Sequence, residues 1–313
     1  MDTCNLREAY GQALVELGRK DPRVVALEAD LGKSTRSCLF KDEFPARYFE
    51  MGIAEQNMTS TAAGLALVGK IPFLSTFAVF ATGRAYDQIR NAVAIPRLKV
   101  RICGSSSGLS DFGDGKTHQS VEDVALMRAV PNMTVLVPVD AVETRAMMHA
   151  LLEHSGPAYL RVNRNDLPTF TSARAPYAIG ATPTIREGRD VVVFANGVMV
   201  SRAVSAAEAL RPEGIELKVV NVSTVKPLNA AAIRAAAASV RRGIIVAEEH
   251  SILGGLAGAV LEVLSEVRHP PSLVVGIPDS FGISARGYEE LLAHFGLTDA
   301  AIAGAARKLV AAG

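Results

Sequence analysis

Two kinds of hydrophobic pattern alternate along the chain. Short apolar runs, such as residues 24–27 and 71–77, have the length of buried strands, whereas residues 6–17 repeat apolar side chains at the spacing of a helix face. This alternation continues through residue 167. Strands that are apolar throughout are typical of a parallel sheet covered by helices on both faces. The pattern therefore predicts an α/β fold with a largely parallel, doubly wound sheet.

The expected elements fall into two groups along the chain. The first group has strands at 24–27, 71–77, 99–103, 134–137 and 158–162, and helices at 6–17, 56–68, 84–93, 121–130 and 141–154. The second group has strands at 190–195, 217–222, 243–247 and 272–275, and helices at 198–210, 230–240, 256–267, 288–295 and 298–310.

The two groups of elements predict two domains. Between them, residues 168–188 show no periodicity and carry Pro168, Pro176 and Pro183, which is typical of a linker. We therefore expect a first domain at 1–167, a linker at 168–188, and a smaller, doubly wound α/β domain at 189–313.

Composition narrows the classes of function. The 313 residues are 49% hydrophobic and 21% charged, with a net charge of +1 and no basic stripe, so no nucleic acid partner is expected. The longest apolar stretch near an expected helix, 252–261, is far shorter than the ~20 residues that a membrane span needs. The three cysteines, Cys4, Cys38 and Cys103, lie far apart and predict neither a disulfide framework nor a metal knuckle.

The chemistry of the N-terminus fits the same conclusion. Charged residues interrupt the first positions before an apolar run can form, so no signal peptide is expected. With its separate cysteines, the chain is expected in the reducing cytoplasm, without a membrane partner.

One carboxylate stands where α/β proteins bind their ligands. A short extended segment, 47–50, runs into Gly52, and Glu55 follows on the first turn of the apolar helix expected at 56–68. Ligands bind near the carboxyl ends of strands in such sheets. The next residues, 59–64, are all small and would let a flat ligand approach the backbone. Glu55 is therefore a candidate for binding a flat ring.

Other candidates follow strands. The polar loop 104–118 has no apolar periodicity and brings Asp114 and His118 close together in sequence, so we expect it to be functional. Phe77 and Phe80 end another strand; they could pack in the core or form a wall for a flat ligand. Arg164 follows the strand at 158–162, whose end could aim it into a cleft.

Four blocks in order carry a family resemblance: residues 28–35, 52–58, 75–77 with 84–90, and 114–119. With them, the chain resembles the C-terminal half of a transketolase, and more specifically the β subunit of a split, two-chain transketolase. Residues 226–228 and 248–250, before the glycines at 254–255, are similar to the C-terminal domain of that superfamily. The resemblance covers nearly the whole chain.

The resemblance implies an activity, a cofactor and a partner. A subunit of this kind transfers a two-carbon ketol unit from a ketose, or ketose phosphate, to an aldose acceptor with thiamine diphosphate. The two domains would be the pyrimidine-binding domain and the C-terminal domain. The segment around Asp114 looks like a diphosphate–metal motif, but residues 139–144 lack the asparagine that should follow, so it is not a metal centre. An N-terminal (α) chain would therefore hold the diphosphate with Mg²⁺ or Ca²⁺, in an α2β2 assembly.

The resemblance also implies residue roles. Glu55 would hydrogen-bond N1′ of the aminopyrimidine, and burial in an apolar setting would favour the neutral carboxyl that this role requires. Glu55 and His118 would be catalytic. The cofactor-binding residues would be Asp30, Glu55, Phe77, Phe80 and His118. The substrate-binding residues would be Arg7, Ser34, Ser106, Asp114, His118 and Arg164.

Three positions depart from the family pattern. Ser106 stands where many transketolases have histidine, and Gly113 where they often have glutamate. Gly83 stands where single-chain enzymes have tyrosine, as expected for the split type. Because Ser106 and Gly113 would alter the substrate channel, they favour a specialised pathway over the usual pentose phosphates.

Three alternatives remain open from the sequence. 1-Deoxyxylulose-5-phosphate synthase shares the segment around 85–88 but is normally one long chain. The β subunit of a 2-oxo-acid dehydrogenase has similar blocks that differ around the catalytic glutamate. A non-catalytic regulatory subunit of the same fold is the third, and Glu55, Phe80, Asp114 and His118 together speak against it.

Overall fold

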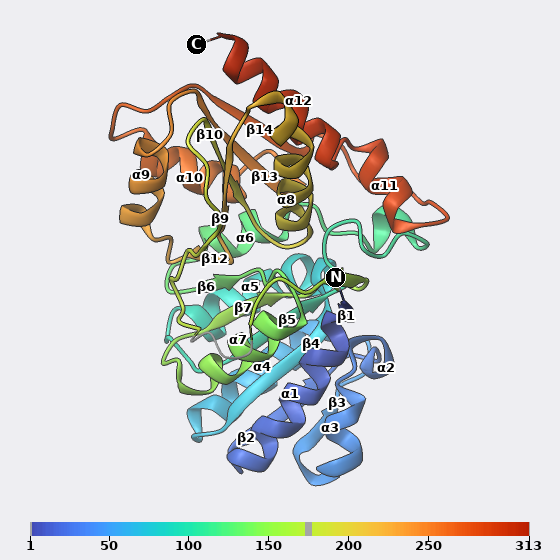
Figure 1. Ribbon diagram of the computed structural model, residues 1–313. Helices are drawn as coiled ribbons and strands as arrows, with labels where there is room; N and C mark the ends of the chain where they lie inside the picture. Colours follow the sequence, from blue (N-terminus) through green and yellow to red (C-terminus); the bar gives the residue numbers. More distant parts are fainter. Residues whose placement is uncertain (1, 173–176, 313) are drawn as a thin grey trace.

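A seven-stranded sheet forms the centre of the lower lobe in Figure 1. The structure is a computed structural model that describes residues 2–172 and 177–312, so Pro176 lies outside the described residues. The strand order is β12-β6-β7-β5-β4-β2-β3, and every neighbouring pair is parallel except β12 with β6. The strands are β2 (Val24–Glu28), β3 (Tyr48–Glu50), β4 (Ile71–Phe77), β5 (Arg101–Ser105), β6 (Thr134–Leu136), β7 (Ala158–Arg161) and β12 (Thr224–Lys226).

Helices cover both faces of this sheet. In β2, Val24 and Ala26 join one hydrophobic core, whereas Val25 and Leu27 join the other. The first core includes side chains of α1 and α7, and the second includes side chains of α4. The helices of this lobe are α1 (Leu6–Lys20), α2 (Gly32–Thr35), α3 (Cys38–Glu43), α4 (Glu55–Leu67), α5 (Tyr86–Gln88), α6 (Asp123–Ala129) and α7 (Ala141–Glu153).

A five-stranded sheet forms the centre of the upper lobe, in the order β14-β13-β10-β11-β9. All pairs are parallel except β9 with β11. The strands are β9 (Thr184–Arg186), β10 (Val191–Ala195), β11 (Leu217–Asn221), β13 (Gly243–Ser251) and β14 (Ser272–Ile277). The helices are α8 (Val198–Leu210), α9 (Ala230–Ala238), α10 (Leu256–Leu264), α11 (Tyr288–His294) and α12 (Asp299–Ala312).

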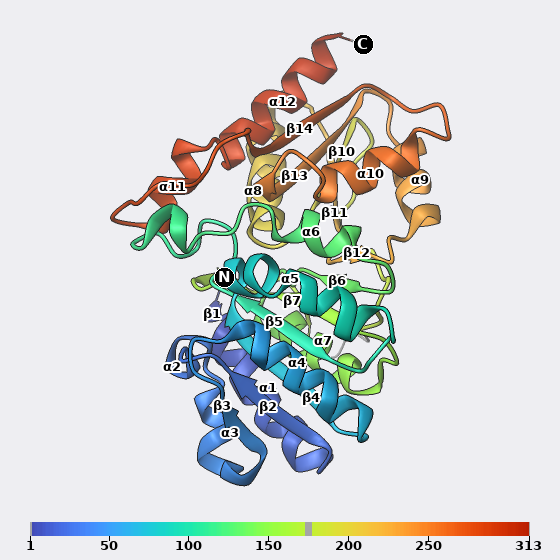
Figure 2. The ribbon, with the colours of Figure 1, turned by 180° about the vertical axis from the view of Figure 1, so that it is seen from behind.

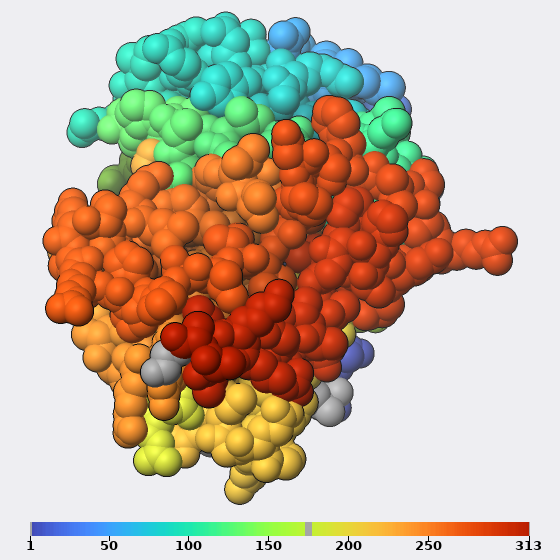
Figure 3. Space-filling view, turned by 90° about the horizontal axis from the view of Figure 1, so that it is seen from above, coloured from blue at the N-terminus to red at the C-terminus, as the bar shows by residue number. Residues whose placement is uncertain are grey.

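The predicted fold class is confirmed, since β10 also divides its side chains between two cores. Val191 and Val193 lie in the core that includes α8 and α12, and Val192 and Phe194 in the core that includes α10. Seen from the side of the upper lobe, its orange and red residues cover the near face, and the first domain shows mainly at one edge (Figure 3). None of the described helices is long and apolar enough to cross a membrane.

Several elements differ from the sequence-based expectations. The helix expected at 84–93 is instead a run of wide π-type turns, η2 (Phe80–Arg84) and η3 (Ile89–Ala94), with the short α5 between them. Strand β12 comes from the second half of the chain but pairs with β6 of the first sheet. The segment 168–188 contains β9, and β1 (Thr3–Asn5) pairs with β8 (Asp166–Pro168). These short strands depend on distant partners, which no local pattern encodes.

The two lobes meet at α6, which lies between the sheets in both ribbon views (Figure 2). The Ala125 amide donates to His250 Nε2 at 3.3 Å, and Arg128 Nη1 donates to the Gly254 carbonyl at 2.9 Å. Beneath them, Arg161 pairs with Asp123 at 2.8 Å, with both side chains buried. Polar contacts therefore fix the C-terminal lobe on the first domain.

Candidate active site

Glu55 is the first residue of α4, close to the carboxyl end of β3. The connection turns at Gly52, whose φ of +66° is unfavourable for residues with a Cβ. The side chain of Glu55 is 1% exposed.

Three rings form a cluster beside the end of β4. The rings of Phe77 and Phe80 are nearly parallel, with centroids 6.0 Å apart. The His118 ring meets both edge-on, at 6.2 Å from Phe77 and 5.4 Å from Phe80. Phe77 is buried and belongs to the strand end, whereas Phe80 and His118 are half-buried. The structure thus brings the two aromatics and the histidine of the polar loop together.

Arg84 connects this cluster to Glu55. Its Nη1 donates to Glu55 Oε2 at 2.8 Å, and its Cζ lies 4.8 Å from the centroid of the Phe80 ring. We expected an apolar setting for Glu55. The structure corrects this prediction, because the Arg84 guanidinium pairs with the buried Glu55 carboxylate. Sequence reasoning assigned Arg84 no role; its place four residues after Phe80, in a turn, was the available signal.

A second group of candidate residues contains several arginine side chains. Arg7 Nη1 donates to the backbone carbonyl of Ser34 at 2.9 Å, and Arg164 Nη1 pairs with Asp111 Oδ2 at 2.5 Å. Burial first, and then the nearby charges of Arg164 and Arg36, lower the pKa of the Arg7 guanidinium. Arg7, Ser34 and Arg164 therefore lie together as expected, with Arg36 and Asp111 as members that the sequence reasoning missed.

The remaining candidates lie on exposed or strained backbone. Asp30 is exposed with φ +60°, and its amide donates to Glu50 Oε1 at 3.0 Å. Asp114 is exposed on the loop. Ser106 is fully buried with φ +51°, and its Oγ lacks a hydrogen-bond partner within the described part of the chain. A buried hydroxyl without a partner is a group that a substrate could satisfy.

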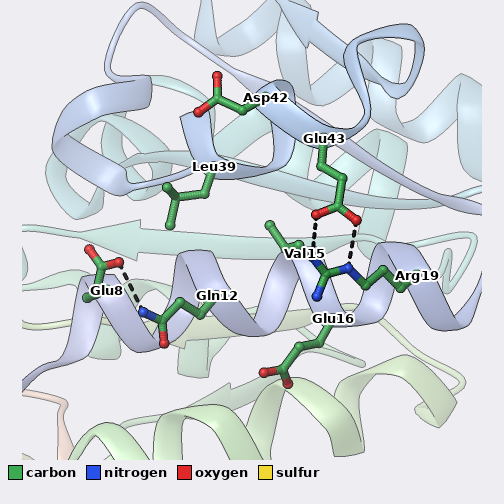
Figure 4. A pocket seen from close by; sticks show the side chains of 8 residues that line it. All are labelled: Glu8, Gln12, Val15, Glu16, Arg19, Leu39, Asp42 and Glu43. Atoms are coloured by element: carbon green, nitrogen blue, oxygen red, sulfur yellow. Dashed lines mark hydrogen bonds and ion pairs between the residues drawn. The ribbon is translucent and has the colours of Figure 1, made fainter.

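Asp30 and Ser34 line a hollow of about 400 Å³ at the end of β2. Glu28 and Glu50 also line it, and burial, followed by the neighbouring Glu50, raises the pKa of Glu28 to about 7. A hollow of about 610 Å³ lies elsewhere, between α1 and α3 (Figure 4). There Arg19 and Glu43 point toward each other and pair through two hydrogen bonds, and none of the predicted site residues lines it.

The C-terminal lobe fastens the polar loop. Glu249 of β13 accepts a hydrogen bond from the Leu109 amide at 2.8 Å. The amide of Ala285 donates to the Phe112 carbonyl at 2.9 Å, and Gln119 Nε2 donates to the Ile283 carbonyl at 2.9 Å. Sequence reasoning did not find these contacts, because they join residues more than 130 positions apart.

The donor set suits half of a cofactor. A buried carboxyl, a pair of aromatic faces and a histidine can hold a flat, nitrogen-bearing ring. Among residues 2–172 and 177–312, the side chains of His, Cys, Asp and Glu form no group of three that could hold a metal ion. The residues of this chain therefore fit the aminopyrimidine part of thiamine diphosphate.

Comparisons with known proteins identify the family. Residues 2–169 match the family model of the transketolase pyrimidine binding domain, and residues 180–302 match that of the transketolase C-terminal domain. The chain is 40% identical over 305 residues to a 6-deoxy-6-sulfo-D-fructose transketolase subunit of Clostridium sp. (strain MSTE9), covering 97% of this chain and 94% of that protein. It is 36% identical to an apulose-4-phosphate transketolase subunit of Phocaeicola vulgatus, covering 93% of each.

A solved structure agrees. A split gene transketolase, an inactive β4 tetramer, is 44% identical, covers 99% of each chain and superposes with a TM-score of 0.89. These matches confirm the resemblance drawn from the four sequence blocks. The chain belongs to the transketolase family, whose members are transferases that depend on thiamine diphosphate, and it contains the pyrimidine-binding and C-terminal domains of that family.

Proposed function

We propose that this chain is the C-terminal (β) subunit of a split transketolase that moves a two-carbon ketol unit from a ketose, or ketose phosphate, to an aldose acceptor. The observation that carries this proposal is the buried Glu55, which Arg84 links to the ring cluster of Phe77, Phe80 and His118. Residues 1–167 would form the pyrimidine-binding domain, 168–188 the linker and 189–313 the C-terminal domain.

Glu55, Asp30 and the three residues of the ring cluster each have a task in the proposed reaction. When bound, thiamine diphosphate supplies the carbon that takes up the two-carbon unit. Glu55 binds N1′ of the aminopyrimidine and shares a proton with it. Phe80 would stack on the ring, with Phe77 behind it, and Asp30 would contribute to holding the cofactor. His118 offers a ring nitrogen to the amino group and to substrate oxygens.

The cationic group selects the acceptor. Arg7 and Arg164 present planar guanidinium groups, which suit the two-point binding of a phosphate or a sulfonate. Ser34 and Ser106 complete this end of the site, and Asp114 reads the configuration of the sugar hydroxyls. The two named relatives act on a sulfonated and a phosphorylated sugar, which supports an anionic substrate in a specialised pathway.

A partner chain completes the enzyme. An N-terminal (α) subunit would hold the diphosphate with Mg²⁺ or Ca²⁺, in an α2β2 assembly in the cytoplasm. Support comes from the split transketolase relatives, which are named as subunits and match this chain over nearly its whole length.

The test compares Glu55→Gln with wild type after reconstitution with the α subunit. We expect ketol transfer to fall at least about a hundredfold, as is typical when a general acid–base group is removed. Glu153→Gln is the matched control, because that carboxylate is 78% exposed. Unchanged turnover in Glu55→Gln would show that this chain is not catalytic.

A substrate comparison separates the related enzymes. Ketose donors and pyruvate are offered to the same complex. Ketol transfer from a ketose is expected, whereas release of CO₂ from pyruvate would place the chain with the synthase or the dehydrogenase instead.

A further inference from the structure

Arg84 makes both of the contacts that the aminopyrimidine requires. Its Nη1 donates to Glu55 Oε2 at 2.8 Å, and its guanidinium carbon lies 4.8 Å from the centre of the Phe80 ring. Under the proposed function, Glu55 and Phe80 are the hydrogen-bond acceptor and the stacking face for the ring. The Arg84 guanidinium and the aminopyrimidine would therefore bind the same two side chains.

The burial of the two partners shows which one must move. Glu55 is 1% exposed, so no ligand atom can reach its carboxylate while its surroundings stay in place. The side chain of Arg84, which donates to that carboxylate, is 45% exposed. Gly83, directly before Arg84, has open space around the position of a Cβ. The arginine is therefore the group that can swing away and open a path to Glu55.

The guanidinium of Arg84 and the aminopyrimidine also have similar chemistry. A guanidinium is planar, carries N–H donors in its plane and stacks on aromatic faces. An aminopyrimidine protonated at N1′ is also planar and presents an N–H donor to a carboxylate. We propose that Arg84 is an internal surrogate for the aminopyrimidine, which neutralises Glu55 in the free site and is displaced when the cofactor binds.

This inference rests on the proposed function and adds a cost to cofactor binding. In the free chain, Arg84 compensates a buried carboxylate that would otherwise stand alone. The cofactor must break the ion pair and the ring contact before it can form its own. Arg84 thus lowers the affinity for thiamine diphosphate and protects the chain until the cofactor is available.

The first experiment measures cofactor affinity directly. Thiamine diphosphate with Mg²⁺ is titrated by calorimetry into the reconstituted complex carrying wild type, Arg84→Met or Arg90→Met. Methionine keeps much of the length but loses the charge and the donors. Arg90 is an exposed arginine of the same segment whose Nη1 donates to the side chain of its neighbour Asn91, so it serves as the matched control.

We expect the Kd of Arg84→Met to fall about fivefold, the combined size of a half-exposed ion pair and a cation–π contact. The Kd of Arg90→Met should match that of wild type. An unchanged or higher Kd for Arg84→Met would overturn the surrogate role while leaving the proposed function standing. If none of the three complexes binds thiamine diphosphate, the proposed function fails, and this inference fails with it.

A second experiment tests the ion pair between Arg84 and Glu55 and needs no cofactor. Melting temperatures of the isolated chain are compared for Arg84→Met, Glu55→Gln and the double variant. Because Arg84→Met leaves the carboxylate without its cation, it should lower the melting temperature, and the added Glu55→Gln should recover part of the loss. Strictly additive effects would mean that the two side chains do not interact in solution, which would also overturn the inference.

Discussion

Glu249 offers a test of the contacts by which the C-terminal lobe holds the polar loop. It is 3% exposed at the junction of the lobes, where it accepts from the Leu109 amide at 2.8 Å and from Asn163 Nδ2 at 3.3 Å. Burial raises the pKa of this carboxyl to about 7, and the neighbouring Arg161 limits the rise. Glutamine has the same shape and imitates the protonated form, so the perturbation is Glu249→Gln.

The direction in which stability changes with pH follows from the number of protons that each state binds. Because the pKa of Glu249 is about 7 in the folded chain and about 4.5 when unfolded, the folded state binds more protons between these values. The stability that this proton contributes is fully present below pH ~4.5 and is lost as pH rises through ~7. The difference in pKa corresponds to about 3 kcal/mol in the free energy of unfolding. Glu249→Gln does not lose this contribution.

The assay is urea denaturation of wild type and Glu249→Gln at a series of pH values between 4.5 and 8.5. The two chains should have similar stability near pH 4.5, and the variant should become progressively more stable than wild type up to a few kcal/mol above pH 7. A difference that is constant with pH, or that favours wild type at high pH, would refute the reasoning. In either case Glu249 would not be a carboxyl whose burial dominates its protonation.

Two further predictions concern stability. Asp140 is fully buried and accepts from the amides of Glu143, Phe170 and Thr171 at 2.7–2.8 Å, so Asp140→Ala should lower the free energy of unfolding by about 3 kcal/mol in urea titrations; a loss below ~1 kcal/mol would contradict this role. Gly104→Ala would place a Cβ 2.3 Å from Tyr159 Oη and should lower the melting temperature, at a cost of ~1–3 kcal/mol. Gly304→Ala, in α12 with open space around it, is the control and should raise stability by ~0.5–1 kcal/mol; equal behaviour of the two variants would show that β5 and Tyr159 do not pack as described.

Local pattern was sufficient for elements whose periodicity is strong. The strand Ile71–Phe77 and the helix Val198–Leu210 have the predicted bounds, because an apolar run and a helical face are each written in consecutive residues. It was insufficient for η2 and η3, where an apolar segment predicted an ordinary helix but the chain forms wider turns. Strand β12 could not be predicted either, because three residues become a strand only beside β6.

The candidate site divides in the same way. Residue types, strand ends and family blocks were enough to select Glu55, Phe77, Phe80 and His118, because the chemistry of a flat, nitrogen-bearing ligand restricts which side chains can hold it. Their roles stay predictions until the variants are measured. The fold adds that the two aromatics and the histidine lie in one cluster.

Periodicity and the identity of side chains were enough to predict the class of fold, the family and the kind of chemistry. The contacts between distant polar groups depend on the tertiary structure: Arg84 meets Glu55 across 29 positions, Arg164 meets Asp111 across 53, and the Leu109 amide meets Glu249 across 140. Hydrogen bonds and ion pairs act over a few ångströms, and the distance between two side chains is set by the packing of whole elements. The order of residues along the chain therefore does not give the distance between two such side chains in the fold.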